Sequence, residues 1–188
     1  MLTRTRTTAL LAVTGLGLST IATLGLAGPA SAATYKCHGV TATIVGTTGS
    51  DDIEGTSGRD IIVALGGSDD IDGNGGNDRI CGGSGSDDID GGRGSDKIWG
   101  QTGNDDIDGG SGNDRIEAGS GRDEVDGDSG RDKIWGQSGN DELQGGSGRD
   151  RISGGSGRDL IEGEGGKDRL SGGTGKDRVY QGEEPDDD

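Results

Sequence analysis

From Gly46 onward an aliphatic residue recurs every nine positions, and polar residues or glycine fill most of the gaps. The period runs without insertion or deletion through fifteen units that end at Tyr180. The eighth position of every unit is Ile, Leu or Val, and the seventh is charged in most units. Because an extended chain turns successive side chains to opposite faces, each unit is predicted to hold a short strand with its aliphatic residue pointing inward.

Two polar positions are as regular as the aliphatic one. The fourth is Gly in every unit, and the first is Gly except at Ala64 and Ala118. A flexible linker is the alternative interpretation of so much glycine, but a linker needs no fixed phase between aliphatic, glycine and acidic positions. We therefore expect an ordered repeat. The sixth position is always Asp: Asp51, Asp60, Asp69, Asp78, Asp87, Asp96, Asp105, Asp114, Asp123, Asp132, Asp141, Asp150, Asp159, Asp168 and Asp177.

These positions resemble the nonapeptide of the RTX family, G-G-x-G-x-D followed by x, a large aliphatic residue and x. Units such as GGSGNDRIE and GGSGRDLIE fit every fixed position. The resemblance implies that the first six residues of each unit form a turn supplying half a calcium site, and that the last three form a strand. Successive units would alternate between two sheets. The expected fold is all-β, a calcium-dependent parallel β-roll, which is a right-handed two-sheet solenoid with 18 residues per coil.

Elementary coordination chemistry agrees with calcium as the cofactor. Calcium takes roughly six to eight oxygen ligands from carboxylates and backbone carbonyls. Glycine lets a turn approach an ion closely and point its carbonyls inward. We therefore interpret all fifteen sixth-position aspartates as metal ligands, with up to thirteen sites between units one coil apart. The thin aliphatic core implies that metal binding and folding are one event. Thr47, Thr56 and Leu65 crowd the second position of the early turns, so the N-terminal sites are expected to be weaker.

The seventh and ninth positions differ between odd-numbered and even-numbered units. If alternate units lie on opposite sheets, this difference predicts one acidic and one basic outer face. Duplication of an 18-residue ancestor would give the same alternation without any binding role, and both explanations stay open. The pattern is clearest in the middle of the repeats, and its exceptions are Ile61, Leu160 and Arg178. The other seventh-position residues are Asp52, Asp70, Asp88, Asp106, Glu124 and Glu142 in odd units, against Arg79, Lys97, Arg115, Lys133, Arg151 and Arg169 in even units.

The two ends of the chain differ from the repeats. Residues 1–32 are predicted to be a signal peptide, because Arg4 and Arg6 precede an apolar run that ends in PASA. A membrane anchor is the competing interpretation, although Thr and Gly dilute the run. We expect a secreted protein, extracellular or at the cell surface. Residues 33–45 are expected to form an N-terminal cap, 46–180 the roll, and 181–188 an acidic C-terminal tail.

Cys37 and Cys81 are expected to form a disulfide, since secreted proteins usually pair their cysteines; two free thiols are the alternative. His38 stands alone and no serine lies in a nucleophile elbow, so we expect no enzymatic activity. At these ends the chain resembles small secreted calcium-binding repeat proteins of Gram-positive bacteria.

The formal net charge of −17 argues against nucleic acid as a partner, because a polyanion would be repelled. The sequence thus predicts a secreted, non-enzymatic protein that binds many calcium ions and folds on binding them. The alternative function is a calcium-stiffened adhesion or extracellular-matrix module. Its outer faces, which carry Trp99 and Trp135, could contact a cell wall or polysaccharide, or associate weakly with an oppositely charged second copy. No membrane span is expected in the roll.

Overall fold

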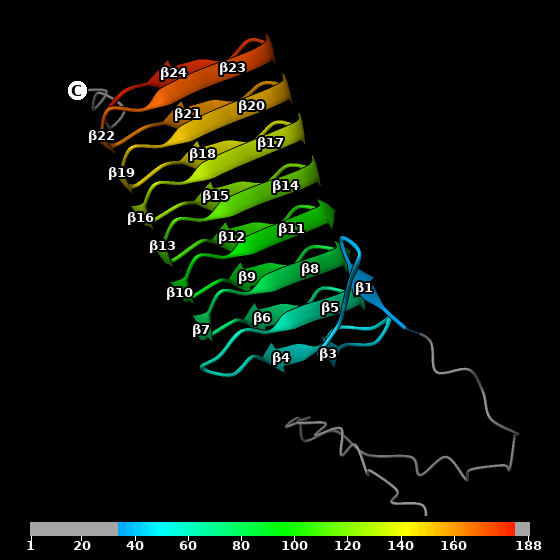
Figure 1. Cartoon of the computed structure of the whole chain (residues 1–188). Helices are drawn as coiled ribbons and strands as arrows, with labels where there is room; N and C mark the ends of the chain where they lie inside the picture. Colours follow the sequence, from blue (N-terminus) through cyan, green and yellow to red (C-terminus); the bar gives the residue numbers. More distant parts are fainter. Residues whose placement is uncertain (1–33, 183–188) are drawn as a thin grey trace, which may run out of the picture.

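A computed structural model of the protein describes residues 34–182. The predicted signal peptide and residues 183–188 of the tail lie outside the described residues. The described chain is a parallel β-solenoid whose paired residues are 18 positions apart, as predicted (Figure 1). Within residues 34–182 no helix is long and apolar enough to cross a membrane.

One eight-stranded parallel sheet, here the even sheet, is built from even-numbered units. Its central strands run past the end of their unit into the first residues of the next one. The strands are β3 (Ile44–Val45), β5 (Ile61–Gly66), β8 (Arg79–Ser84), β11 (Lys97–Thr102), β14 (Arg115–Gly121), β17 (Lys133–Gly139), β20 (Arg151–Gly157) and β23 (Arg169–Gly175).

A second eight-stranded parallel sheet, the odd sheet, contains the odd-numbered units. Each of its strands has the predicted three residues, and in β9 and β12 the middle residue is buried between two exposed ones. The strands are β4 (Asp52–Glu54), β6 (Asp70–Asp72), β9 (Asp88–Asp90), β12 (Asp106–Asp108), β15 (Glu124–Asp126), β18 (Glu142–Gln144), β21 (Leu160–Glu162) and β24 (Arg178–Tyr180).

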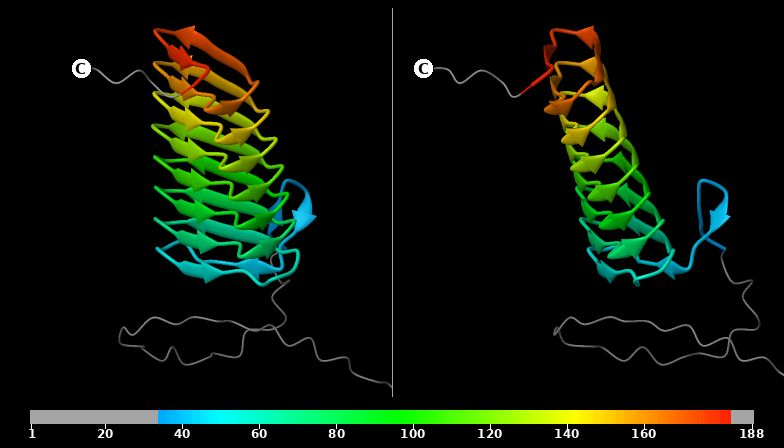
Figure 2. Two further views of the ribbon diagram at one scale, coloured as in Figure 1. Left: turned by 90° about the vertical axis from the view of Figure 1, so that its left-hand side faces the viewer. Right: turned by 60° about the vertical axis from the view of Figure 1, so that its left-hand side comes forward.

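A third sheet was not predicted. Its six two-residue strands stack along the turn that leads from the odd sheet to the even sheet, so the coils have two long sides and one short one (Figure 2). The strands are β7 (Gly75–Gly76), β10 (Arg93–Gly94), β13 (Ser111–Gly112), β16 (Ser129–Gly130), β19 (Ser147–Gly148) and β22 (Gly165–Gly166).

The eighth-position residues of both sheets meet inside the roll and form one continuous apolar core, which confirms the prediction from the nine-residue period. The first-position Ala64 and Ala118 join this core, whose buried eighth-position members are Ile53, Ile62, Ile71, Ile80, Ile89, Ile98, Ile107, Ile116, Val125, Ile134, Leu143, Ile152 and Ile161.

The segment before the repeats divides into two parts. β3 pairs with β5 and continues the even sheet, and Ile44 packs against the core. Ahead of it, β1 (Lys36–Cys37) and β2 (Val40–Thr41) form an antiparallel hairpin that lies against the outer face of the even sheet (Figures 1 and 2). This segment therefore lies against the side of the roll through its hairpin and extends the even sheet through β3.

A disulfide between Cys37 and Cys81, with an S–S distance of 2.07 Å, holds the hairpin in place. His38 stacks on Trp99 with ring centroids 3.9 Å apart, which buries Trp99 to 6% exposure. Ile61, whose seventh-position neighbours along the even sheet are basic, belongs to the same buried cluster. An apolar residue occurs there because the hairpin covers that part of the face.

Candidate metal centre

The sixth-position aspartates lie inside the turns rather than on the surface. In the middle of the roll their side chains are almost fully buried, and the exposed fraction of Asp114 is 2%. Asp51, Asp168 and Asp177 near the ends are half-buried. The buried members are Asp60, Asp69, Asp78, Asp87, Asp96, Asp105, Asp114, Asp123, Asp132, Asp141, Asp150 and Asp159.

From Asp69 to Asp177, one oxygen of each sixth-position carboxylate links two coils. The Oδ1 atom of Asp114 accepts a hydrogen bond of 2.8 Å from the backbone N–H of Asp96, which occupies the same position one coil earlier. The same bond is repeated thirteen times along the two columns of aspartates, with donor–acceptor distances from 2.7 to 3.2 Å. The aspartates are therefore part of the frame of the solenoid as well as candidate ligands.

The other oxygen has no donor in eleven of these residues. Burying an ionised carboxylate without a compensating charge or hydrogen bond is costly, so an unpartnered oxygen at this depth needs a cation or a proton. The Oδ2 atoms without a partner belong to Asp69, Asp78, Asp87, Asp96, Asp105, Asp114, Asp123, Asp132, Asp141, Asp150 and Asp159.

Burial has a direct electrostatic consequence for these carboxyls. Loss of solvation raises the pKa of Asp105 and Asp114 to about 7, although the backbone hydrogen bond from the preceding coil lowers it in part. Repulsion from the aspartates one coil away adds to the increase. Burial likewise raises the pKa of Asp132 to about 7 and that of Asp96 to about 6. The columns are thus unfavourable for bare anions and favourable for a bound cation.

The first-position glycines leave room beside these oxygens. A Cβ atom added to Gly82 would lie 2.6 Å from Oδ2 of Asp87 and 3.1 Å from the carbonyl oxygen of Gly100 in the next coil. At Gly109 both corresponding distances are 3.2 Å, to Oδ2 of Asp114 and to the carbonyl of Gly127. A carboxylate oxygen and a carbonyl oxygen from successive coils therefore approach the same small space. Such a set of oxygens fits calcium, which takes carboxylate and carbonyl ligands together.

Two turns depart from this arrangement. Ala64 and Ala118 begin the units that contain Asp69 and Asp123, and both alanines are fully buried against the core. Their methyl groups fill the space beside the Oδ2 atom that the first-position glycines leave without a side chain. We expect weaker sites in these two turns.

In the first two turns a threonine donates to the Oδ2 atom, which has no donor in most later turns. The backbone N–H and hydroxyl of Thr56 donate hydrogen bonds of 2.7 and 2.8 Å to Oδ2 of Asp60. Thr47 makes the same pair of contacts with Oδ2 of Asp51, at 2.6 and 3.0 Å. These threonines were expected only to crowd the early turns, and they also satisfy the carboxylates. Leu65, the third residue of that group, adopts the positive φ of the later turns, at 82°.

The C-terminal end of the roll has a comparable contact. The side-chain amide of Gln181 donates a 2.7 Å hydrogen bond to Oδ2 of Asp168. Sequence reasoning missed this role because it placed Gln181 in the tail. The signal was available in its position, since Gln181 directly follows the last complete unit and brings a donor where the other units have glycine or alanine.

The outer acidic residues do not build a second type of site. Asp88 and Asp106 project from the odd sheet and are exposed. Within residues 34–182 no three His, Cys, Asp or Glu side chains gather into a metal-binding cluster.

Comparison with known proteins agrees with this geometry. A family model described as the RTX calcium-binding nonapeptide repeat, in four copies, matches residues 45–80, 82–116, 108–143, 117–152 and 144–179. The chain belongs to this RTX repeat family. It is a calcium-binding repeat protein, and calcium is the ion that its buried carboxylates and turn carbonyls fit.

Two further comparisons add little. No match is found among the curated proteins. Among solved structures, the RTX chain is similar to a hyperactive, Ca2+-dependent, β-helical antifreeze protein from an Antarctic bacterium, at 23% identity and a TM-score of 0.29. The similarity covers 73% of this chain and 62% of the other protein, which is less than two thirds of that protein's length.

Proposed function

We propose that this RTX protein is a secreted, non-enzymatic calcium-binding protein that folds as calcium enters its turns. The observation that carries the proposal is the set of eleven buried Oδ2 atoms without a hydrogen-bond donor. Without calcium, each coil adds two buried carboxylates that repel those of the neighbouring coils. With calcium, the same oxygens become ligands and hold successive coils together.

The proposed ligands are the sixth-position aspartates from Asp69 to Asp159. Asp51 and Asp60 are assigned to metal-free end turns, because Thr47 and Thr56 already donate to their carboxylates. Asp168 and Asp177 are assigned to the other end, where Asp168 is held by Gln181. The number of strong sites is therefore smaller than the thirteen that the repeat count alone allows.

Circular dichroism of the chelated and calcium-loaded chain tests the proposal. Excess chelator should abolish the β signal, and calcium should restore it. Magnesium serves as the matched control, because it demands a tighter octahedral shell and gives up its water reluctantly. A β spectrum that survives chelation would show that the fold does not depend on calcium.

Export is proposed from separate observations. Arg4, Arg6 and the PASA sequence have the pattern of a signal peptide, and the Cys37–Cys81 disulfide suits an oxidising compartment. Protein recovered from the culture medium should begin at Ala33. Retention of the intact chain in the cells would contradict export.

A further inference from the structure

The C-terminal half of the even sheet carries a group of exposed cations that take no part in calcium binding. Six exposed cations from three successive even units line a shallow hollow of about 380 Å³, whose floor contains the buried Asp132 and Asp150. The six cations lie at the fifth and seventh positions of their units, so the solenoid repeats them in register from coil to coil. This basic strip consists of Arg131, Lys133, Arg149, Arg151, Lys167 and Arg169.

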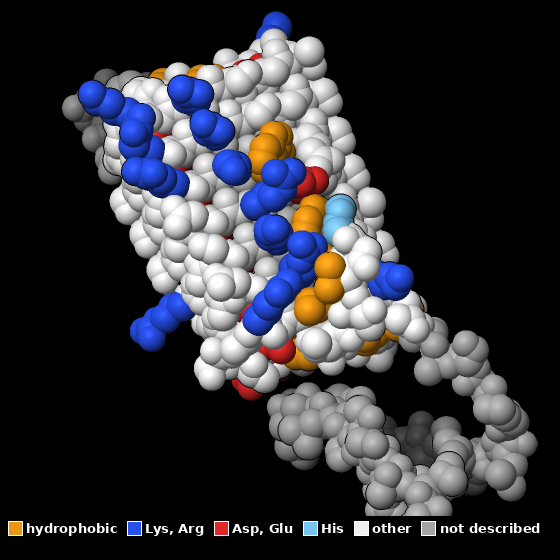
Figure 3. Space-filling view, viewed as in Figure 1, with side chains coloured by type: hydrophobic (Ala, Val, Ile, Leu, Met, Phe, Trp, Pro, Cys, Tyr) orange, Lys and Arg blue, Asp and Glu red, His pale blue; other side chains and the backbone are white. Residues whose placement is uncertain are grey.

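Within residues 34–182 the cations of the basic strip have no acidic ion-pair partner. Figure 3 shows blue side chains gathered along this face. Like charges at the strand spacing of about 4.8 Å repel one another, so an anionic ligand would relieve a repulsion that the fold maintains.

The side chain of Trp135 lies beside the basic strip. Trp135 follows Lys133 by two residues on β17 and projects from the same face. The Arg115 guanidinium lies over its ring, 4.3 Å from the centroid, and a salt bridge to Glu117 orients that arginine. On the following coil Trp135 is paired with Ser153, which has a small side chain, and Trp135 itself is partly exposed. Unlike Trp99, this tryptophan is not covered by the hairpin.

Hydroxyl groups continue the surface past the tryptophan. Ser138, Ser156 and Thr174 lie in register on β17, β20 and β23. Each hydroxyl donates to a backbone carbonyl of the preceding coil at 3.4 Å, which leaves its oxygen free to accept. Gln137 lies on the same strand as Trp135, and its amide N–H donates to Oε2 of Glu117 at 3.3 Å, which leaves its carbonyl oxygen to accept. Cations, one aromatic face and a row of hydroxyl and amide groups together match the chemistry of a charged sugar chain.

We infer that this surface binds an anionic polysaccharide. The basic strip would hold its sulfate or carboxylate groups, and Trp135 would stack on a sugar ring. A short anionic sugar chain can stay within the strip, whereas a long polyanion such as a nucleic acid would extend beyond these coils and be repelled by the net charge of −17. An acidic face of a second copy would supply the negative charges but has no sugar ring to stack on Trp135. The inference rests on the proposed function, because the strip is assembled only in the folded, calcium-loaded roll.

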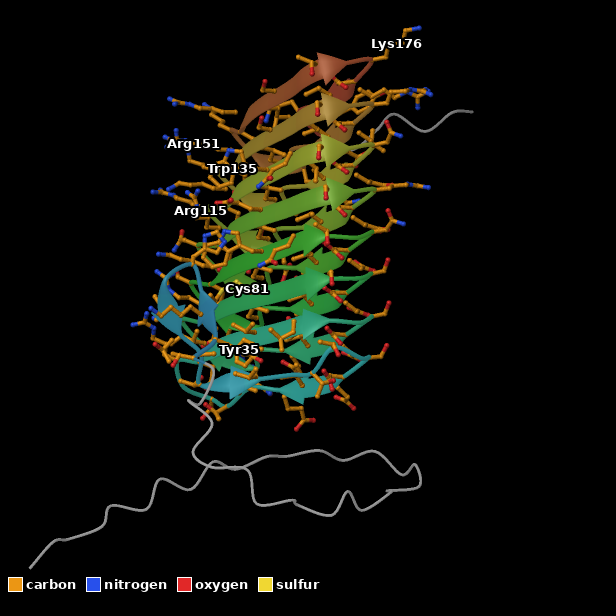
Figure 4. The ribbon with its side chains drawn as sticks, turned by 90° about the vertical axis from the view of Figure 1, so that its right-hand side faces the viewer. Tyr35, Cys81, Arg115, Trp135, Arg151 and Lys176 are labelled. Atoms are coloured by element: carbon orange, nitrogen blue, oxygen red, sulfur yellow. A yellow bond between two sulfur atoms is a disulfide. The ribbon has the colours of Figure 1, made fainter. Side chains whose placement is uncertain are left out.

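Binding of a labelled dextran sulfate oligosaccharide to the calcium-loaded chain tests the inference. Neutral dextran controls for the sugar and poly-glutamate of equal charge controls for the anion. The test variant combines Lys133→Glu, Arg151→Glu and Arg169→Glu, a change that the fold accommodates because odd units carry Glu at this position. The matched control makes the same charge change at Arg122, Arg158 and Lys176, which are exposed fifth-position residues of odd units. Figure 4 shows Arg151 and Lys176 at opposite edges of the roll.

The inference predicts that the strip variant weakens dextran sulfate binding roughly tenfold or more, from the loss of several exposed ion contacts, while the control variant changes it little. Trp135→Ala should weaken dextran sulfate binding about fivefold and leave poly-glutamate binding unchanged. Equal losses in the two charge variants would overturn the inference. A second result would also overturn it: poly-glutamate binds as tightly as dextran sulfate, and Trp135→Ala weakens neither. That result would indicate that the surface binds an acidic protein instead.

Circular dichroism of the same samples separates this inference from the proposed function. Chains that fold with calcium but do not bind dextran sulfate would contradict the surface alone. Chains that remain folded and bind after chelation would contradict calcium-dependent folding alone.

Discussion

The backbone N–H of Asp96 donates to Oδ1 of Asp114, so a single carboxylate closes the contact between two coils. Its second oxygen, Oδ2, has no donor and faces the space beside Gly109. Structure and metal binding are therefore joined in one side chain. A change at this position should affect both at once.

Replacing Asp114 by Ala should lower the number of bound calcium ions and destabilise the roll. Loss of Oδ1 leaves the buried N–H of Asp96 without an acceptor, which costs about 1–3 kcal/mol. Asp106→Ala is the matched control, because Asp106 projects from β12 into solvent. Isothermal titration calorimetry gives the ion count, and equal losses in the two variants would contradict the register of the sites.

The end turns should not contribute calcium ions. Asp60→Ala should leave the ion count unchanged, because Thr56 already donates to this carboxylate. Asp78→Ala in the next coil should remove calcium, since Oδ2 of Asp78 has no donor. Equilibrium dialysis against calcium distinguishes the two. A loss of ions on replacing Asp60 would show that the first turns bind metal despite their threonines.

Calcium binding should weaken as the pH falls below about 7. In the metal-free roll, burial raises the pKa of Asp105 from 3.8 to about 7, so the folded chain holds this proton more tightly than the unfolded chain does. Protonated Asp105 therefore stabilises the metal-free roll against unfolding. This contribution is complete below about pH 4 and is lost as the pH rises through about 7. Calcium must displace these protons, which lowers its apparent affinity in acid.

The same linkage predicts that the chelated chain gains β structure on acidification. Circular dichroism in chelator at pH 4 and pH 8 measures this difference, with the calcium-loaded chain as a reference. More β structure at pH 8 than at pH 4 in the chelated chain would contradict buried carboxyls with raised pKa values.

The fourth position of the turn should accept only glycine. Gly112 has a φ of 149°, and a Cβ there would collide with the carbonyl of Gly94 in the preceding coil. Gly112→Asn should therefore prevent stacking of the coils and lower the calcium-induced β signal. Gly75→Asn is the control at the third position, where an added Cβ would lie 3.6 Å from the nearest atom of the next coil. Thermal unfolding with calcium compares them, and similar midpoints would contradict this difference between the two positions.

Much of this fold follows from the sequence because its chemistry is periodic. Ile98 and Ile107 lie on opposite sheets as the nine-residue period predicts, and the acidic and basic seventh positions separate with them. The docked hairpin was not predicted. Its contacts, such as His38 on Trp99, join a segment outside the repeat to one part of the outer face of the even sheet. A nine-residue period cannot predict a contact made by residues that do not repeat.

The candidate site was predictable in type but not in extent. A count of aspartates treats Asp51 and Asp114 alike, since both occupy the sixth position. They differ because Thr47 can donate to Asp51, whereas Gly110 at the equivalent position has no hydroxyl group. The short third sheet was also missed, because its two-residue strands contain mostly Gly and Ser, which carry no strand pattern.

Anomalous diffraction from crystals of the calcium-loaded chain tests the central claim most directly, because it locates each ion. We predict peaks within the turns, beside the unpartnered Oδ2 atoms of units that begin with glycine, and no peak beside Asp51 or Asp60. Peaks along the exposed acidic column of the odd sheet, with the turns empty, would contradict the account. The turn peaks are expected beside Asp78, Asp87, Asp96, Asp105, Asp114, Asp132, Asp141, Asp150 and Asp159.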